Sequence, residues 1–236
     1  MARLTILTPK ELQALYDLPQ FTDEDRETYF VLEPIEKHAM ELFRTYAAKT
    51  YFILQLGYFK AKKQFFVFEL QTVTEDVQYI LHRHFPKVTE LFNPAISKPT
   101  RLAQQKEILN LLDYQLCSQE WKLKLQKQAQ YLVNIYSKPV YLFKELLNYL
   151  EHHRVVLPGY TFMQEVVVGK AITLEQKRLE QAILTGVPEE KRIQLDALLT
   201  SEDSLYQLTL FKREPKDFSY QEIGCFGLSL RKGKAR

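Results

Sequence analysis

The apolar run YFILQLGYF at Tyr51–Phe59 is the most informative segment of this chain for its fold. It is far shorter than the roughly 20 apolar residues that a membrane span needs. A helix that is apolar on every side must be buried on every side. The run therefore predicts a central buried helix, which ends in the basic residues of Lys60–Lys63.

The segments on both sides of this run carry helical spacing and helix-start signals. Apolar residues recur three or four positions apart in residues 35–46 and again in residues 73–81. The sequence TPKE at residues 8–11 offers an N-cap, a proline at the first helical position and a capping-box glutamate. Thr22 precedes an acidic helix start of the same kind. We therefore predict an all-α fold of consecutive small helical modules.

Glycine is scarce, with 7 residues in a chain of 236, about 3% where roughly 7% is usual. Sheet-rich folds use glycine in their turns, and phosphate-binding loops use it where the backbone approaches the ligand. The low glycine content argues against a dinucleotide-binding domain, a P-loop and a β-barrel.

No targeting or membrane segment is expected. No apolar run reaches the length of a membrane span, and the N-terminus proceeds directly to a helix start without a signal peptide. The two cysteines, Cys117 and Cys225, are more consistent with free thiols in a reducing compartment than with a disulfide. We expect a cytoplasmic protein with no contact with a membrane.

The clearest predicted domain boundary is the proline-containing segment at residues 92–99. It separates a first helical module, residues 1–95, from a second, residues 99–172. Further helices are expected in residues 173–223, followed by a basic tail in residues 224–236.

The net charge of +3 conceals a gradient along the chain. Residues 1–48 carry 5 basic and 9 acidic side chains, whereas residues 49–106 carry 9 and 4. A basic segment after an acidic one is consistent with a surface that faces a polyanion, and equally with ordinary surface variation.

Motifs of common enzymes are missing. The sequence contains no P-loop, no HExxH, no CxxC and no GxSxG motif. His82 and His84 lie two positions apart, on different faces of a helix, and are not expected to share a metal ion. We predict no cofactor, no metal site and no catalytic residue.

Residues 139–171 have the layout of a helix-turn-helix unit, with Pro158 and Gly159 in the turn. In that layout the second helix enters the major groove of DNA. An α-helical period places Phe162, Met163, Val166 and Val167 inward. It places Thr161, Gln164 and Val168 outward, where they would contact bases, while Arg154 and Tyr160 would contact phosphates. The alternative is a helical hairpin with a solvated face.

Two further segments are candidates for DNA contacts. The first is Lys98–Lys106 (KPTRLAQQK), where Thr100 would cap a helix. The start of this helix, with Lys98 and Arg101, would bind a phosphate. One turn further on, Gln104 and Gln105 would reach base edges. The alternative is a polar helix start. Lys60, Lys62 and Lys63 form either a phosphate-binding patch or a solubilising loop.

Taken together, six segments resemble the N-terminal region of Tn-three-family transposases, the large enzymes of replicative transposons. The similarity covers about residues 4–223, and the six segments that carry it, by their order and spacing, are LPQFTDEDRETYFVL, FILQLGYFKAKKQFF, KPTRLAQQKEIL, RVVLPGYTFMQEVV, ITLEQKRLEQAIL and LTLFKREPKDFSYQEI. The resemblance implies two successive helical modules that bind double-stranded DNA at the terminal inverted repeats of a transposon.

The catalytic Asp-Asp-Glu domain of those transposases has no match in this sequence, so the resemblance implies a non-catalytic chain. The last residues, GCFGLSLRKGKAR, no longer resemble the family and suggest a truncated or frame-shifted transposase, or a fragment that ends in non-family sequence. The alternative function is that of a regulatory protein that pairs with a full-length transposase and inhibits it. The protein partner would be a second copy of this chain, in a homodimer, or that transposase. The protein would act in the bacterial cytoplasm, associated with the nucleoid.

Overall fold

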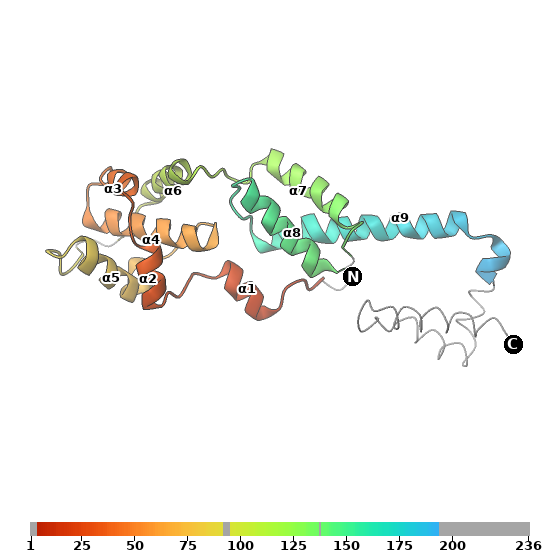
Figure 1. Ribbon diagram of the computed structural model, residues 1–236, viewed down its shortest axis with the longest axis horizontal. Helices are drawn as coiled ribbons and strands as arrows, with labels where there is room; N and C mark the ends of the chain where they lie inside the picture. Colours follow the sequence, from red (N-terminus) through yellow and green to blue (C-terminus); the bar gives the residue numbers. More distant parts are fainter. Residues whose placement is uncertain (1–3, 92–94, 137, 194–236) are drawn as a thin grey trace. The chain divides into compact units, whose positions relative to one another are not determined.

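The computed structural model describes residues 4–91, 95–136 and 138–193, and these residues form helices with no β-strand among them (Figure 1). The predicted all-α class is therefore confirmed. The chain divides into two compact units, residues 1–177 and residues 178–236. Part of the helical region expected in residues 173–223 lies outside the described residues, as do the basic tail and Cys225.

The first part of the chain folds around the predicted central helix, α4 (Tyr46–Lys62). It contacts four other helices, which surround it in Figure 1: α2 (Asp23–Tyr29), α3 (Pro34–Met40), α5 (Thr74–His84) and α6 (Lys98–Leu112). All residues of Tyr51–Phe59 are buried. A short 3₁₀ turn, η1 (Leu70–Val73), precedes α5. The all-round apolar run is thus explained by neighbours on every side of α4.

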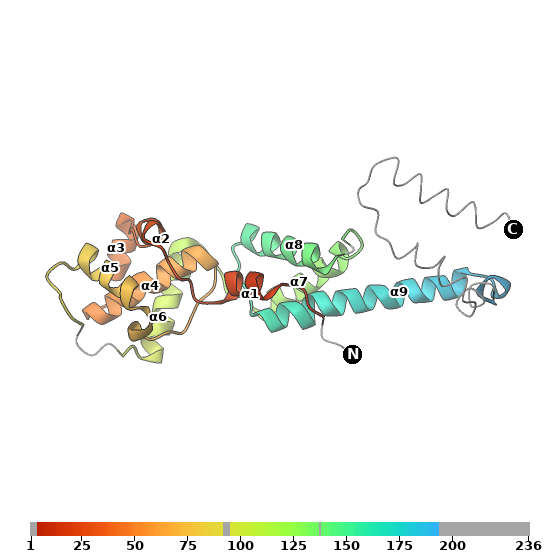
Figure 2. The same ribbon diagram turned by 90° about the horizontal axis from the view of Figure 1, so that it is seen from below.

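A second core lies in the C-terminal half of the same compact unit. It is formed by α7 (Gln119–Leu132), α8 (Pro139–His152) and the π-helical turn η2 (Phe162–Gly169), which continues into α9 (Lys170–Gly186). Figure 2 shows α7 and α8 beside the start of this long helix. The N-terminal residues Ile6 and Leu7 also pack here, just before α1 (Pro9–Tyr16).

The division between the two cores differs from the predicted boundary at residues 92–99. Ile108 of α6 is fully buried in the first core, whereas residues 6 and 7 belong to the second. The segment does not separate the two cores, because α6, which follows it, packs on α4.

The helix-start signals are confirmed where a side chain caps the helix. Thr8 and Thr22 each accept a hydrogen bond from the third backbone N–H of the helix and form complete capping boxes with Glu11 and Asp25. The carboxyl groups of Glu11 and Asp25 accept hydrogen bonds from the backbone N–H groups of Thr8 and Thr22, respectively. These hydrogen bonds are the main reason that the pKa of each carboxyl is lowered. The start of α6 is capped by Ser97 and not, as predicted, by Thr100.

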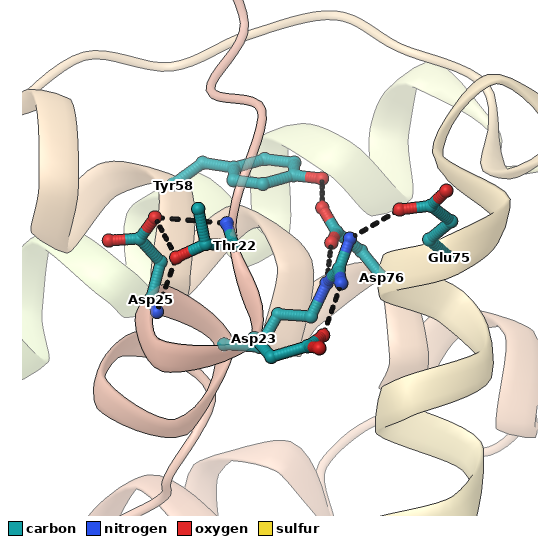
Figure 3. A network of polar contacts seen from close by, with 7 residues as sticks. Thr22, Asp23, Asp25, Tyr58, Glu75 and Asp76 are labelled. Carbon is teal, nitrogen blue, oxygen red and sulfur yellow. Dashed lines mark hydrogen bonds and ion pairs between the residues drawn. The ribbon is translucent and has the colours of Figure 1, made fainter.

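A polar network joins α2, α4 and α5 (Figure 3). The Arg26 guanidinium donates to Asp76 at 2.7 Å and to Glu75 and Asp23, each also at 2.7 Å. The Tyr58 hydroxyl donates to the other oxygen of Asp76 at 2.5 Å. Burial, together with this hydrogen bond to a carboxylate, raises the pKa of Tyr58, so the hydroxyl keeps its proton and donates.

Gly57 allows a close approach between α4 and the end of α2. A Cβ atom at this position would lie 2.6 Å from the ring of Phe30, a fully buried side chain, and 3.1 Å from the Tyr29 carbonyl oxygen. We expect Gly57→Ala to lower the free energy of unfolding by about 1–3 kcal/mol, because the added methyl overpacks the core. Urea denaturation measures this change.

Gly159→Ala is the matched control. A Cβ atom at Gly159 meets nothing within 4 Å, and its φ is not positive. We expect that variant to remain within about 0.5 kcal/mol of the wild-type free energy of unfolding. Equal losses in both variants would contradict the close contact at Gly57.

Candidate nucleic-acid interface

The start of α6 presents the first group of predicted DNA-binding residues. Lys98 is exposed, and Thr100 is half-buried with its hydroxyl 2.8 Å from that of Ser97. Arg101 is half-buried beside Tyr51, where burial raises the pKa of the hydroxyl and the charge of Arg101 partly offsets this rise. It also lines a cavity of about 370 Å³ with Tyr51 and Phe68. A guanidinium and an exposed ammonium group at a helix start suit a phosphate.

Gln104, one turn further along α6, does not face solvent, so the prediction that it reaches base edges is wrong. Its side chain is fully buried against α4. Its amide nitrogen donates to the Ala48 carbonyl oxygen at 2.8 Å, and its amide oxygen accepts from Gln55 at 3.0 Å. Gln105 is half-buried and is the remaining amide of this pair with some access to solvent.

The second predicted group lies at the turn after α8 and in η2, and here the predicted face is partly wrong. Gln164 is only 5% exposed, and its amide nitrogen donates to the Leu4 carbonyl oxygen at 2.5 Å. Val168 is fully buried in the second core. Val166, predicted to face inward, is exposed instead.

The buried positions of η2 are 163, 164, 167 and 168, one residue along from the predicted inward set of 162, 163, 166 and 167. The predicted face was therefore one residue out of phase. The segment η2 has π-helical geometry, in which hydrogen bonds run i→i+5. Gly169 fits this geometry, since a Cβ atom there would lie 2.9 Å from the Gln164 carbonyl oxygen.

The residues that precede η2 keep positions suited to a ligand. Thr161 is exposed, and Tyr160 is half-buried with its ring against Tyr16 and Phe143 at centroid distances of 5.5 and 6.1 Å. Arg154 is exposed, has a φ of 51° and pairs with exposed Asp113 at 3.0 Å. An ion pair between two exposed side chains opens at little cost, so Arg154 can exchange this partner for a phosphate.

The three lysines after the central helix do not form a free cationic patch. Lys60 pairs with buried Glu36 at 2.7 Å, Lys62 donates to the Ala14 carbonyl oxygen, and Lys63 donates to the Lys60 carbonyl oxygen at 2.6 Å. Burial lowers the pKa of both Lys62 and Lys63. These side chains fasten the end of α4 to its surroundings, so the prediction of a phosphate-binding patch is not supported at this position.

Sequence reasoning missed a cationic groove between α3, the start of α4 and the end of α5. Its volume is about 680 Å³, and its polar lining includes Lys37, His38, Glu41, Lys49, Arg83 and His84. The signal was present in the sequence, because both helices carry basic residues in their last turns. The sequence does not indicate that the ends of these two helices lie at the same groove.

Two properties of the described residues bear on other kinds of site. They contain no group of three or more His, Cys, Asp or Glu side chains that could hold a metal ion. Within the same residues, no helix combines the length and the apolar character that a bilayer crossing requires. Burial raises the pKa of the Cys117 thiol, which is free and half-buried.

One known protein family matches most of the chain. Residues 6–169 match the family described as Domain of unknown function (DUF4158). The chain belongs to this family. No curated protein matches the sequence.

The DUF4158 match contains the first core, almost all of the second core and every candidate DNA-binding residue named above. It ends at Gly169, the last residue of η2, so α9 begins directly after it. The cationic groove also lies within the DUF4158 domain. Any function of these surfaces is therefore a function of the domain itself.

Proposed function

We propose that this DUF4158 protein binds double-stranded DNA at the terminal inverted repeats of a transposon, as the non-catalytic N-terminal part of a DNA transposase. The observation that carries the proposal is the order and spacing of the segments, spread along residues 4–223, that resemble Tn-three-family transposases. Such a protein would act in the bacterial cytoplasm, on the nucleoid.

The structure supports the proposal at the start of α6 and at the turn before η2. Both sites combine a basic side chain with polar groups near a helix start: Lys98 and Arg101 at the first, and Arg154 and Thr161 at the second. Backbone N–H groups at a helix start and nearby cations favour phosphate oxygens. These contacts would supply affinity and position the domain on the duplex.

Sequence readout must use fewer residues than the sequence suggested. With Gln104, Gln164 and Val168 buried, the candidates with access to solvent are Gln105 and Thr161. Glutamine hydrogen-bonds adenine, and threonine contacts either a base edge or a thymine methyl group. We therefore propose that these two positions contribute to base discrimination.

Fluorescence anisotropy with a terminal-repeat duplex and a scrambled duplex of equal length tests this function. We expect tighter binding to the terminal repeat, with affinity that falls steeply as salt rises, by a log–log slope of about −0.9 per phosphate contacted. Equal affinity for the two duplexes would contradict sequence-specific binding. Binding to neither would contradict the proposed function altogether.

Replacing Lys98 and Arg101 together by alanine should weaken both duplexes alike. Loss of one to two phosphate contacts reduces the salt slope by about 0.9–1.8, and affinity at 0.1 M salt by roughly 8- to 60-fold. Lys106→Ala, an exposed cation later on the same helix, is the control and should change affinity far less. A loss confined to the terminal repeat would mean that these residues read bases.

A second candidate function is pairing with a full-length transposase or with another copy of this chain. The observation that favours it is a group of apolar side chains on α9 that are about half exposed: Leu174, Leu179, Ile183 and Leu184. Exposed apolar residues in one region are typical of interaction surfaces. Co-purification with a transposase in the absence of DNA, lost on Leu179→Glu, would favour this function.

A further inference from the structure

We propose that the groove between α3, α4 and α5 seats a phosphate group, which in the proposed function is a phosphate of the DNA backbone. The inference rests on the proposed function for the identity of its ligand. The affinity for phosphate is inferred from the groove itself, where side chains from three helices present positive charge to a cavity of about 680 Å³.

The charge of the groove is not neutralised by its own residues. Lys37 and Arg83 are exposed, and neither forms an ion pair within the part of the chain that the structure describes. The carboxylate that lines the groove, Glu41, is engaged by Lys49. Lys37 and Arg83 are therefore available to an anion.

The fold explains why these cations gather. Basic residues are favourable in the last turn of a helix, where the macrodipole is negative. Both α3, with Lys37 and His38, and α5, with Arg83 and His84, end at this groove. The first turn of α4, at Tyr46, begins there and adds the positive end of its own dipole.

His84 lines the groove together with Lys37 and Arg83. Its Nε2 atom lies 2.9 Å from the Phe30 carbonyl oxygen, which fixes the orientation of the ring. Burial lowers the pKa of His84, and the charges of Arg83 and Lys37 lower it further. Two cations on different helices thus act on the same imidazole, and an anion seated between them would offset their effect.

The test begins with inorganic phosphate as the probe and imidazole NMR resonances as the readout. We expect phosphate to shift the resonances of His38 and His84 and to raise the pKa of His84. His82, which is exposed on α5 but does not line the groove, is an internal control and should not respond. The variant Lys37→Ala/Arg83→Ala should lose the response while retaining the wild-type melting temperature.

The second arm uses the terminal-repeat duplex. Lys37→Ala/Arg83→Ala should reduce the salt slope of binding by about 0.9–1.8 and affinity at 0.1 M salt by roughly 8- to 60-fold. Lys10→Ala/Lys127→Ala removes two exposed cations outside the groove and is the matched control. Equal losses in the two double variants would overturn the groove as a specific seat.

The outcomes separate this inference from the proposed function. Phosphate-dependent shifts at His38 and His84 in a protein that binds no duplex would support the groove and overturn the proposed function. Duplex binding that is unchanged in Lys37→Ala/Arg83→Ala, with no shift in phosphate, would overturn the groove and leave the proposed function standing.

Discussion

Replacing Asp76 by alanine is expected to lower the free energy of unfolding by about 3–5 kcal/mol, the range for breaking one partner of a buried ion pair. The Asp76 carboxylate is buried, with a side chain only 7% exposed, and it binds both Arg26 and Tyr58. Its removal leaves a guanidinium that is 12% exposed and a buried hydroxyl without their shared acceptor. Urea denaturation followed by circular dichroism measures the change.

Glu75→Ala is the matched control for this variant. Glu75 binds the same guanidinium at the same distance of 2.7 Å, but its side chain is 84% exposed. Exposed ion pairs contribute roughly 0–1 kcal/mol, because water solvates the separated charges well. If Glu75→Ala proved as destabilising as Asp76→Ala, burial would not be the origin of the effect. Asp76→Asn, which keeps the shape and one acceptor, should fall between the two.

The fold was largely predictable because its signals are local. The all-round apolar run at Tyr51–Phe59 requires neighbours on every side, and the capping boxes at Thr8 and Thr22 require only residues within one turn. The partners of Asp76 were not predictable in this way. Arg26 and Asp76 are 50 residues apart. Nothing in the sequence around Arg26 indicates that its partner is Asp76.

The candidate site was predicted less well, for two physical reasons. The apolar residues of η2 fit more than one inward face, and the predicted face was one residue out of phase with the structure, which buries Gln164 and Val168. The lysines were assumed to be solvated, whereas Lys60 forms an ion pair with the buried carboxylate of Glu36. Exposure depends on contacts between distant segments, which a local pattern does not contain.

The second large effect is expected at Gln104, where stability and DNA recognition can be told apart. Gln104→Leu keeps the size of the side chain but removes both of its hydrogen bonds. The Gln55 amide nitrogen loses its acceptor, and the Ala48 carbonyl oxygen loses a donor, both in a buried position between α4 and α6. The Ala48 carbonyl oxygen keeps its helical hydrogen bond within α4, so only the Gln55 amide is left unsatisfied, and the free energy of unfolding should fall by about 1–3 kcal/mol.

Gln105→Leu is the control, because it makes the same chemical change at the next position, which is half-buried. We expect this variant to lose under about 1 kcal/mol of stability and to weaken discrimination between the terminal-repeat and scrambled duplexes. Gln104→Leu, measured below its melting temperature, should keep the wild-type ratio of the two affinities. A change in that ratio for Gln104→Leu without a loss of stability would mean that the amide leaves the core to read DNA, contrary to its position in the structure.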